Sequence, residues 1–276
     1  MKTSESTLAG AAGVTLHTVE WTPDDGEIVA DVVLVHGYGE HSGRYAPVAE
    51  TLTDAHLRVA ALDLRGHGRS SGLRRGDIDS FDRIVDDVAA FVDSVRTDRP
   101  LFLYGHSMGG LAVTRYAERG DAGLAGLVIT SPALAAAESI PAPLVAVANV
   151  LGKLTPGLRT IKLDGNAISR DAAVRADYDA DPLNFRGKLT AGTGREMNVA
   201  MGEAMAAAGR ITCPVLVLHG EADALTAPVG SERLVAAVSS SDVTYRTWPG
   251  AYHELHHEPE RLEVLSTIVS WITAHA

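Results

Sequence analysis

The chain of 276 residues carries 24 Lys and Arg residues against 35 Asp and Glu residues, which gives a net charge of −11. No basic run interrupts this acidic balance, so the composition argues against nucleic acid as a partner. No apolar run approaches the ~18 residues of a membrane-spanning helix, and segment 1–21 lacks the charged start and apolar core of a secretion signal. We expect a cytoplasmic protein, with peripheral association with a membrane or the cell envelope, and a homodimer, as open alternatives.

Strand-like and helix-like runs alternate from the start of the chain, which indicates a mostly parallel sheet covered by helices. Residues 13–21 alternate with period two, as in an antiparallel edge hairpin. Residues 30–37 form a continuous apolar run that ends in glycine, which is typical of a central strand buried on both faces. An amphipathic helix follows at 80–98, with Ser80 as a candidate N-cap. The other elements expected up to Pro132 are helix 44–56, a strand with its loop at 57–70, strand 100–105, helix 109–120 and strand 124–132.

The alternation of strand-like and helix-like runs stops after Pro132. Residues 133–210 are rich in Ala, Gly and Pro, and the next strand-like run is 213–220. We therefore predict a helical cap at 133–210, inserted into an α/β core formed by residues 1–132 and 211–276. The core resumes with helix 228–240, strand 243–250 and helix 258–276. The single cysteine, Cys213, begins a buried-strand context and is interpreted as structural.

The segment GHSMG at 105–109 fits the pattern G-x-S-x-G between a strand-like and a helix-like run. In that setting a tight turn lifts the serine hydroxyl out of the sheet, and the glycines leave room for neighbouring backbone. The amide of Met108 opens the following helix and can face a developing oxyanion. The pattern predicts Ser107 as a nucleophile.

A serine nucleophile needs a base and an orienting carboxylate, which in this fold follow the serine in the order acid, then histidine. Asp223 is favoured over Glu221 as the acid because it lies past the tight turn that ends strand 213–220. His253 is favoured as the base because it is nearest to the end of strand 243–250. His256 and His257 are expected to be solvated surface residues.

Two further histidines, His36 and His219, each end a strand just before a glycine, so we expect both to be buried and hydrogen-bonded. The second oxyanion donor should come from the loop after strand 30–37. The amide of Tyr38, which follows the turn at His36 and Gly37, is placed to pair with that of Met108. The alternative is that this segment is a plain glycine turn.

Together these stretches resemble the monoacylglycerol lipase family of α/β-hydrolases, in its bacterial form. The resemblance is carried, in chain order, by HGYGEHSGRY, DLRGHGRS, GHSMGG, ISRD followed by YDADPL, LHGEADALTAP and PGAYHELHHEPE. It implies an α/β-hydrolase fold, with a mostly parallel central sheet flanked by helices and a cap insertion. It also implies a serine hydrolase that cleaves monoacylglycerols to fatty acid and glycerol through an acyl-enzyme.

The resemblance further implies that Glu40, Arg44, Tyr178 and His256 border the site of the glycerol head group. For Glu40 and Arg44 the alternative is an internal salt bridge that holds their loop. Position 38 departs from the family, because Tyr38 stands where members usually carry a smaller or aliphatic residue. That departure affects the side-chain surroundings of the oxyanion hole, whereas the backbone amide is unchanged.

The apolar stretch 140–154 is either a helix packed on the core or the lining of an acyl-chain tunnel that also touches a membrane. The same fold serves general carboxylesterases and lysophospholipases, which are the nearest alternative functions. A catalytically silent receptor or scaffold is the alternative from another class. No histidine spacing typical of a metal site is present, so we expect neither a metal nor another cofactor.

Overall fold

The computed structural model describes residues 1–135 and 149–276. Its centre is an eight-stranded sheet with the strand order β1-β2-β4-β3-β5-β6-β9-β10. Each neighbouring pair from β4 to β10 in this order is parallel, whereas β2 pairs antiparallel with both β1 and β4 at one edge. The bounds are Lys2–Ala9 (β1), Thr15–Thr22 (β2), Ala30–Val35 (β3), Leu57–Leu62 (β4), Leu101–His106 (β5), Gly126–Thr130 (β6), Val215–Gly220 (β9) and Val243–Trp248 (β10). The predicted, mostly parallel sheet is confirmed.

The antiparallel edge arises where the period-two pattern predicted it. In β2 the apolar residues Leu16, Val19 and Trp21 are buried, Leu16 in one core cluster and Val19 and Trp21 in the other, while the residues between them are partly exposed. All of β1 pairs with β2, from Lys2 opposite Thr22 to Ala9 opposite Thr15. The sequence did not indicate β1, because almost all of its side chains are exposed and polar and no apolar alternation marks it.

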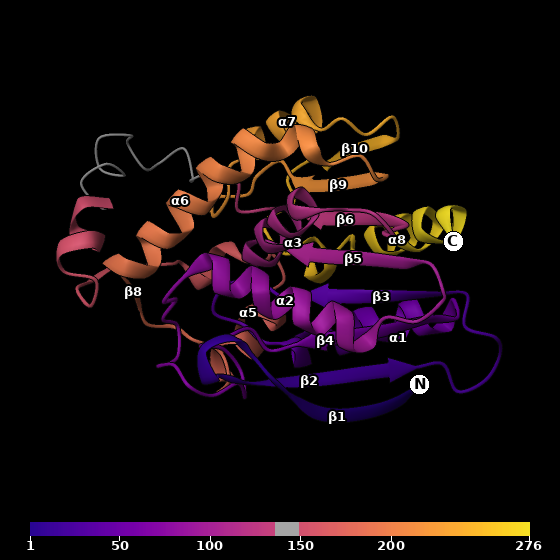
Figure 1. Cartoon of the computed structure of the whole chain (residues 1–276), viewed down its shortest axis with the longest axis horizontal. Coiled ribbons are helices and arrows are strands. Elements are labelled where there is room, and N and C mark those ends of the chain that lie inside the picture. Colours follow the sequence, from indigo (N-terminus) through magenta and orange to yellow (C-terminus); the bar gives the residue numbers. More distant parts are fainter. Residues whose placement is uncertain (136–148) are drawn as a thin grey trace.

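Helices cover both faces of the sheet (Figure 1). Successive side chains of a strand point to opposite faces, so Val33 and Val35 of β3 pack in one core cluster with α2 and α3. Val32 and Leu34 pack in the other cluster with α1 and α8. These helices and α7 span Ala46–Asp54 (α1), Phe81–Val95 (α2), Met108–Arg119 (α3), Pro228–Ala237 (α7) and Arg261–His275 (α8). Within the two described ranges, no helix has the length and apolar character to cross a membrane.

The helix predicted at 80–98 is α2, but its predicted cap is wrong. The side chain of Ser80 makes no hydrogen bond to the helix. Instead the Phe81 amide donates to Glu196 Oε2 of the helix Ala191–Ala207 (α6) at 3.2 Å. A carboxylate is a stronger acceptor than a hydroxyl and is favoured at the positive end of a helix, so a residue distant in the sequence takes the capping role.

Between β6 and β9 the described chain forms the helices Ala172–Ala180 (α5) and Ala191–Ala207 (α6). It also forms a short antiparallel pair of strands, Arg159–Lys162 (β7) and Lys188–Thr190 (β8). We expected helices alone here, and such short strands leave no periodic signal in the sequence. Figure 1 places α6 and β8 at the end of the sheet toward which β3 and β5 point. Loops that follow parallel strands emerge at this end, where ligands bind in open α/β sheets.

Candidate active site

Ser107 lies between the end of β5 at His106 and the start of α3 at Met108. Its φ of 55° and ψ of −117° put a non-glycine residue in a strained region. The surrounding backbone holds this conformation, because the Ser107 amide donates to Thr130 O at 3.0 Å and the Ala133 amide donates to Ser107 O at 2.9 Å. The strain raises the side chain to a cavity wall, as the G-x-S-x-G pattern predicts.

The two glycines of the pattern allow the turn to pack against the sheet. A Cβ atom on Gly109 would lie only 2.0 Å from the carbonyl oxygen of Val35 in β3. A Cβ atom on Gly105 would lie 2.5 Å from the carbonyl oxygen of Gly109 itself. Any side chain at either position would push α3 away from the sheet and move Ser107 with it.

Asp223 and His253 meet beside this turn, although 30 residues separate them in the sequence. Asp223 follows β9 and His253 follows β10, and the two strands are parallel neighbours. His253 Nδ1 lies 2.7 Å from Asp223 Oδ2, and both side chains are buried. Asp223 Oδ1 accepts the amides of Leu225 and Thr226 at 2.8 and 3.0 Å. Because Nδ1 donates to the carboxylate, Nε2 of a neutral His253 is free to accept a proton.

The contact shifts the pKa of both groups. Burial opposes ionisation of Asp223, but the charge of His253 and hydrogen bonds from His219 and His253 outweigh it, so the pKa of this carboxyl lies far below its ordinary value. Burial also opposes the charged form of His253, but the Asp223 carboxylate outweighs it and raises the pKa of His253. At neutral pH Asp223 is therefore an anion that favours a proton on His253.

The alternative acid and bases lie elsewhere. Glu221 is exposed and accepts a hydrogen bond from Thr247 Oγ1 at 2.7 Å. His257 is partly buried and contacts Glu254 Oε2 at 2.8 Å. The expectation that His256 is solvated is wrong: only 2 % of it is exposed, because the Leu255–His257 turn places it against the rings of Tyr45 and His106.

The expectation for the two strand-ending histidines is confirmed. His36 is fully buried, and its Nε2 accepts the Leu64 amide at 2.9 Å while its Nδ1 contacts Gly37 O at 2.7 Å. His219 is also fully buried and contacts Ser231 and Asp223 through its two ring nitrogens.

The loop after β3 brings Gly37, the residue before Tyr38, close to Ser107. A Cβ atom on the preceding Gly37 would lie 3.1 Å from Ser107 Cβ. Within the described ranges, the amides of Tyr38 and Met108 make no backbone hydrogen bond in a turn, loop or cap. The tyrosine side chain, which departs from the family pattern, donates to Gly76 O at 2.7 Å and packs its ring at right angles to Phe185. Its hydroxyl is therefore already bonded within the protein.

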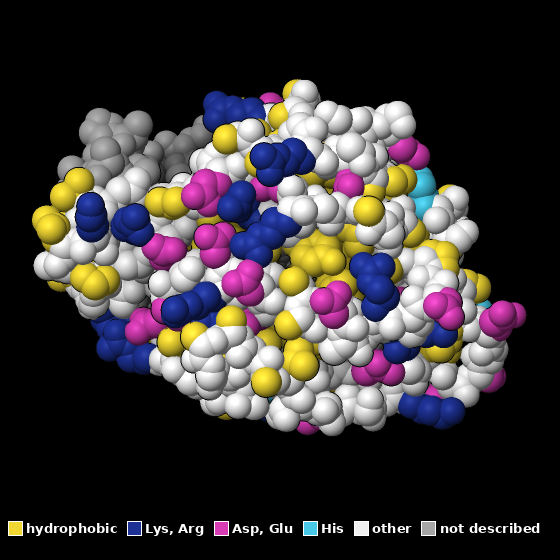
Figure 2. Space-filling view, viewed as in Figure 1, with side chains coloured by type: hydrophobic (Ala, Val, Ile, Leu, Met, Phe, Trp, Pro, Cys, Tyr) yellow, Lys and Arg dark blue, Asp and Glu magenta, His cyan; other side chains and the backbone are white. Residues whose placement is uncertain are grey.

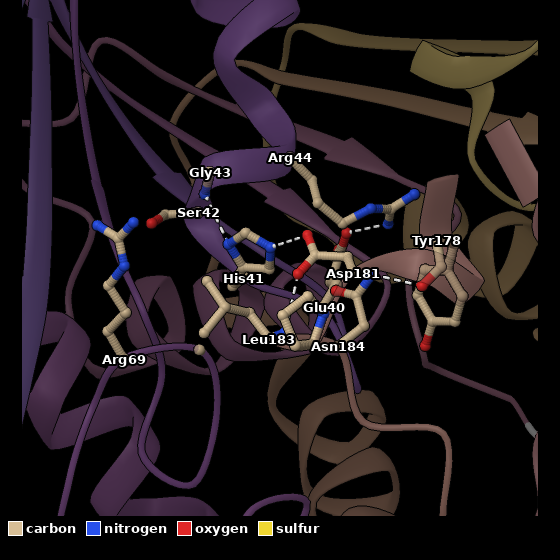
Figure 3. Close-up of polar contacts among 12 residues, drawn as sticks. Glu40, His41, Ser42, Gly43, Arg44, Arg69, Tyr178, Asp181, Leu183 and Asn184 are labelled. Carbon is tan, nitrogen blue, oxygen red and sulfur yellow. Dashed lines mark hydrogen bonds and ion pairs between the residues drawn. The ribbon is translucent and has the colours of Figure 1, made fainter. Parts of the chain in front are cut away.

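The same loop is bonded to the segment between β6 and β9 (Figure 3). His41 Nε2 lies 2.8 Å from Asp181 Oδ2. The Phe185 amide and the Tyr178 hydroxyl both donate to Gly39 O, at 2.9 and 3.2 Å. The HGYGEHSGRY and YDADPL stretches therefore lie side by side, and the inserted segment holds the backbone next to Tyr38.

A buried charge cluster lies behind this loop. Arg44 donates to Glu40 Oε2 at 2.6 Å and to both carboxylate oxygens of Glu254 at 2.6 and 2.7 Å, and its guanidinium lies over the Tyr178 ring. Glu40 Oε1 also accepts the Gly37 amide and the Tyr45 hydroxyl. Burial opposes ionisation of both carboxyls, but the charge of Arg44 lowers the pKa of Glu40 and holds that of Glu254 well below its ordinary value. The internal salt bridge that we kept as the alternative for Glu40 and Arg44 is present.

His106 and His256 lie between this cluster and His253. Ring centroids are 4.7 Å apart for His106 and His253, and 4.8 Å apart for His106 and His256. Burial lowers the pKa of His106 to about 3 and the pKa of His256 far below its ordinary value, so both rings are neutral at neutral pH. Neither ring nitrogen of His256 has a partner in the described part of the chain.

These features surround a cavity of about 320 Å³. Ser107, His253, Glu40 and Tyr178 line it, whereas Arg44 and His256 lie behind the lining. The rest of the wall is mostly apolar and comes largely from the inserted segment, including Leu151, Ile161, Leu163, Leu189, Met197 and Met201. Of the stretch 140–154, residues 140–148 lie outside the described residues, while Leu151 lines the cavity as predicted for a tunnel.

Sequence reasoning missed three residues of the site. Ser131, at a φ of 44°, donates to the carbonyl oxygen of His253 at 2.7 Å. Thr226 Oγ1 lies 2.9 Å from Asp223 Oδ2, and Glu254 joins Arg44. All three lie in loops that follow parallel strands, which is the signal that could have identified them.

Glu254, His256 and His257 also bring possible metal-binding atoms within 4.8 Å of one another. Both carboxylate oxygens of Glu254 already accept hydrogen bonds from Arg44, whose positive charge would repel a cation. The group therefore does not have the chemistry of a metal site.

Comparisons with known proteins agree with this architecture. The model of the family described as serine aminopeptidase, S33, matches residues 26–260. A monoacylglycerol lipase from Mycolicibacterium smegmatis is 43% identical over 99% of this chain and 98% of its own length. A human monoglyceride lipase is 37% identical over 96% of this chain and 89% of its own length.

A crystal structure of the monoacylglycerol lipase of Paleococcus ferrophilus superposes with a TM-score of 0.83 at 37% identity, and each chain is covered completely. These matches extend over all or nearly all of the chain. The chain belongs to the monoacylglycerol lipase family of α/β-hydrolases.

Proposed function

We propose that this protein hydrolyses the ester bond of monoacylglycerols to a fatty acid and glycerol, with Ser107, His253 and Asp223 as its catalytic triad. One observation carries the proposal. A strained serine and a histidine bonded to a buried carboxylate line the same cavity, whose wall is apolar over most of its area. The names of the full-length relatives support the substrate class.

Acylation begins when Ser107 Oγ attacks the ester carbonyl carbon and its proton passes to His253 Nε2. The Asp223 carboxylate, 2.7 Å from Nδ1, stabilises the imidazolium that forms. The carbonyl oxygen becomes an oxyanion, which we assign to the amides of Tyr38 and Met108. The intermediate then expels glycerol, which takes the proton from His253, and leaves the fatty acyl group on Ser107.

Deacylation repeats these steps with water as the nucleophile, and it regenerates the free hydroxyl of Ser107. The apolar part of the cavity wall, which includes Leu151 and Met201, suits the acyl chain, because burial of each methylene contributes about 0.8 kcal/mol. A monoacylglycerol has one such chain and two free hydroxyls. We assign the hydroxyls to the polar part of the lining around Glu40, Tyr178 and Glu254, with Arg44 and His256 as supports behind it.

One observation favours a general carboxylesterase or lysophospholipase as the second candidate. Glu40, Arg44 and Glu254 already bond one another, so this cluster is complete without a diol. A role restricted to holding the loop would leave the enzyme without selection for glycerol esters.

The deciding experiment compares one acyl chain on several leaving groups. Purified enzyme is given a monoacylglycerol, the matching di- and triacylglycerols, a lysophospholipid and a nitrophenyl ester, with Ser107→Ala as the blank. We expect kcat/KM to be highest for the monoacylglycerol among the natural lipids, because its one acyl chain suits the apolar wall and its small diol suits the polar part of the lining. Equal or faster hydrolysis of the lysophospholipid would favour the second candidate.

We also propose that residues 133–210 form a cap that contacts a lipid surface. Val150, Leu154, Leu158, Ile161 and Leu163 are large apolar side chains that are exposed in this segment. Three of the chain's four lysines, Lys153, Lys162 and Lys188, lie in the same segment of an otherwise acidic protein. Figure 2 shows hydrophobic and basic side chains gathered at this end of the molecule. Such a mixture suits the interface of an anionic bilayer.

Co-sedimentation with vesicles tests this contact. We expect binding to phosphatidylglycerol vesicles to exceed binding to phosphatidylcholine vesicles, and Leu154→Ser to weaken it. Leu262→Ser is the matched control, since Leu262 is 74 % exposed and Leu154 is 72 % exposed, but Leu262 lies on α8. Equal loss with both variants would contradict a specific role for the cap.

A further inference from the structure

His219 is a buried histidine next to the proposed triad that the mechanism above does not use. It lies near the end of β9, four residues before Asp223, and is fully buried. Its Nε2 lies 3.1 Å from Asp223 Oδ2, and its Nδ1 lies 2.7 Å from Ser231 Oγ on α7. A hydrogen-bonded chain therefore runs from Ser231 through His219 and Asp223 to His253.

The partners determine which nitrogen of His219 carries the proton. Ionised Asp223 only accepts hydrogen bonds, so the contact at Nε2 requires a hydrogen on that nitrogen. With the hydrogen on Nε2, Nδ1 accepts the hydroxyl hydrogen of Ser231, which is also fully buried. Ser231 thus holds His219 in the tautomer that donates to Asp223.

Asp223 Oδ2 is the shared acceptor of this arrangement. It receives His253 Nδ1 at 2.7 Å, Thr226 Oγ1 at 2.9 Å and His219 Nε2 at 3.1 Å. The donor from His219 approaches from inside the protein, on the β9 and α7 side, whereas His253 lines the cavity. The oxygen that faces the base is therefore fixed from both sides.

The backbone around His219 is packed closely enough to transmit this position. A Cβ atom on the next residue, Gly220, would lie 2.2 Å from Tyr252 O and 2.5 Å from Ala251 O. The loop that carries His253 therefore rests directly on the end of β9. A shift of His219 would displace both the acid and the base.

We propose that His219, held by Ser231, is a positioning residue that directs Asp223 Oδ2 at His253 for the acyl-enzyme reaction. The inference rests on the proposed triad. The His219 N–H also shares the negative charge of Oδ2 with His253. Removal of the His219 N–H leaves more of the negative charge of Oδ2 to stabilise protonated His253.

The test uses His219→Leu, which removes the donor, and His219→Gln, whose side-chain amide can donate to Asp223 and accept from Ser231. With a soluble nitrophenyl ester, we expect His219→Leu to lower kcat about tenfold or more with KM unchanged. We also expect the acid limb of the kcat/KM profile to move to higher pH. His219→Gln should recover most of kcat and the original limb. Ser231→Ala should lower kcat by roughly threefold, again without a change in KM.

Circular dichroism and the unfolding temperature establish that each variant is folded. Wild-type kcat with an unmoved acid limb in His219→Leu would overturn the proposal. So would equal losses in His219→Leu and His219→Gln without a shift of the limb, because that pattern indicates packing alone. If His219→Leu does not fold, His219→Gln and Ser231→Ala decide, and wild-type kcat in Ser231→Ala would overturn the assignment.

Asp223→Asn, measured in parallel, separates this inference from the mechanism on which it rests. An active Asp223→Asn enzyme would refute the triad itself. An inactive Asp223→Asn enzyme beside a normal His219→Leu enzyme would refute only the role of His219.

Discussion

Two buried carboxylates near the cavity are paired with bases of different kinds. Asp223 is paired with His253, and Glu254 is paired with Arg44. In both pairs the carboxyl pKa is lowered against the effect of burial. The histidine can gain or lose a proton near neutral pH, whereas the guanidinium stays protonated. We infer that the first pair moves a proton during catalysis and that the second holds the loop, so the partner rather than the carboxylate determines the role.

The largest effect should come from removing the proposed nucleophile. We expect Ser107→Ala to lower kcat by about 10⁵- to 10⁶-fold without loss of fold. His253→Ala should be similarly severe, because Ser107 then has no base. His257→Ala is the control and should have a mild effect, since His257 contacts Glu254 on the side of the second pair. Steady-state kinetics measures the result, and substantial activity in Ser107→Ala would contradict the mechanism.

Asp223→Asn should have the next largest effect, a loss of kcat of about 10⁴-fold. An amide in place of the carboxylate can donate to His253 Nδ1, which would turn the imidazole to the wrong tautomer. Glu221→Gln is the matched control, because Glu221 lies two residues away but is exposed and bonded to Thr247. Comparable losses in the two variants would count against Asp223 as the orienting acid.

Disruption of the pair between Arg44 and Glu254 should lower the stability of the folded protein. Arg44→Met leaves Glu40 and Glu254 buried without their counter-ion, and we expect the free energy of unfolding to fall by about 3–5 kcal/mol. Arg69→Met removes the pair with Glu5, where both side chains are about half exposed, and should cost under about 1 kcal/mol. Denaturant titration of both variants gives the comparison. A small loss in Arg44→Met would mean that the cluster does not hold the loop.

The pairs should also differ in their pH response. His253 must be neutral to accept the proton of Ser107, so kcat/KM should fall as the pH drops through the raised pKa of His253 in the free enzyme. The midpoint should lie above 6.5, the ordinary value for histidine, and the rate should fall about tenfold per pH unit below it. The pair of Arg44 and Glu254 should cause no further change of kcat/KM with pH near neutrality. A midpoint below 6.5 would contradict the raised pKa.

The smallest effect concerns the polar lining. Tyr178→Phe removes the hydroxyl of a residue that lines the cavity, and we expect about 1 kcal/mol of transition-state binding to be lost with monoacylglycerol. A nitrophenyl ester of the same acid has no diol and should lose less. His256→Ala should affect both esters equally, because His256 lies behind the lining. An equal loss on both esters in Tyr178→Phe would instead favour a supporting role through Gly39.

Local patterns in the sequence were sufficient for most of the core. The continuous apolar run at 30–37 indicates a central strand, so β3 could be predicted. The alternation at 13–21 indicates an edge strand, so β2 could be predicted as well. The elbow around Ser107 was predictable for the same reason, because strand, glycine turn and helix follow one another directly. Each of these features depends only on residues that are near in the sequence.

Contacts between distant segments could not be predicted in this way. The cap of α2 was misassigned because Glu196 lies 115 residues from Phe81. His256 was expected at the surface because nothing near it in the sequence indicates that Tyr45 and His106 enclose it. The Arg44–Glu254 pair joins residues 210 positions apart.

The sequence by itself determined the alternation of strands and helices and the turn that carries Ser107, and it singled out Asp223 and His253, which the structure brings together. It also indicated that His219 is buried. Only the tertiary structure decided that His219 contacts Asp223, that Arg44 is shared by two carboxylates, and that Glu40 and Tyr178 reach the cavity while His256 does not. The reason is physical: periodicity records which face of an element is buried, whereas the partner on that face depends on how the parallel strands bring their loops together.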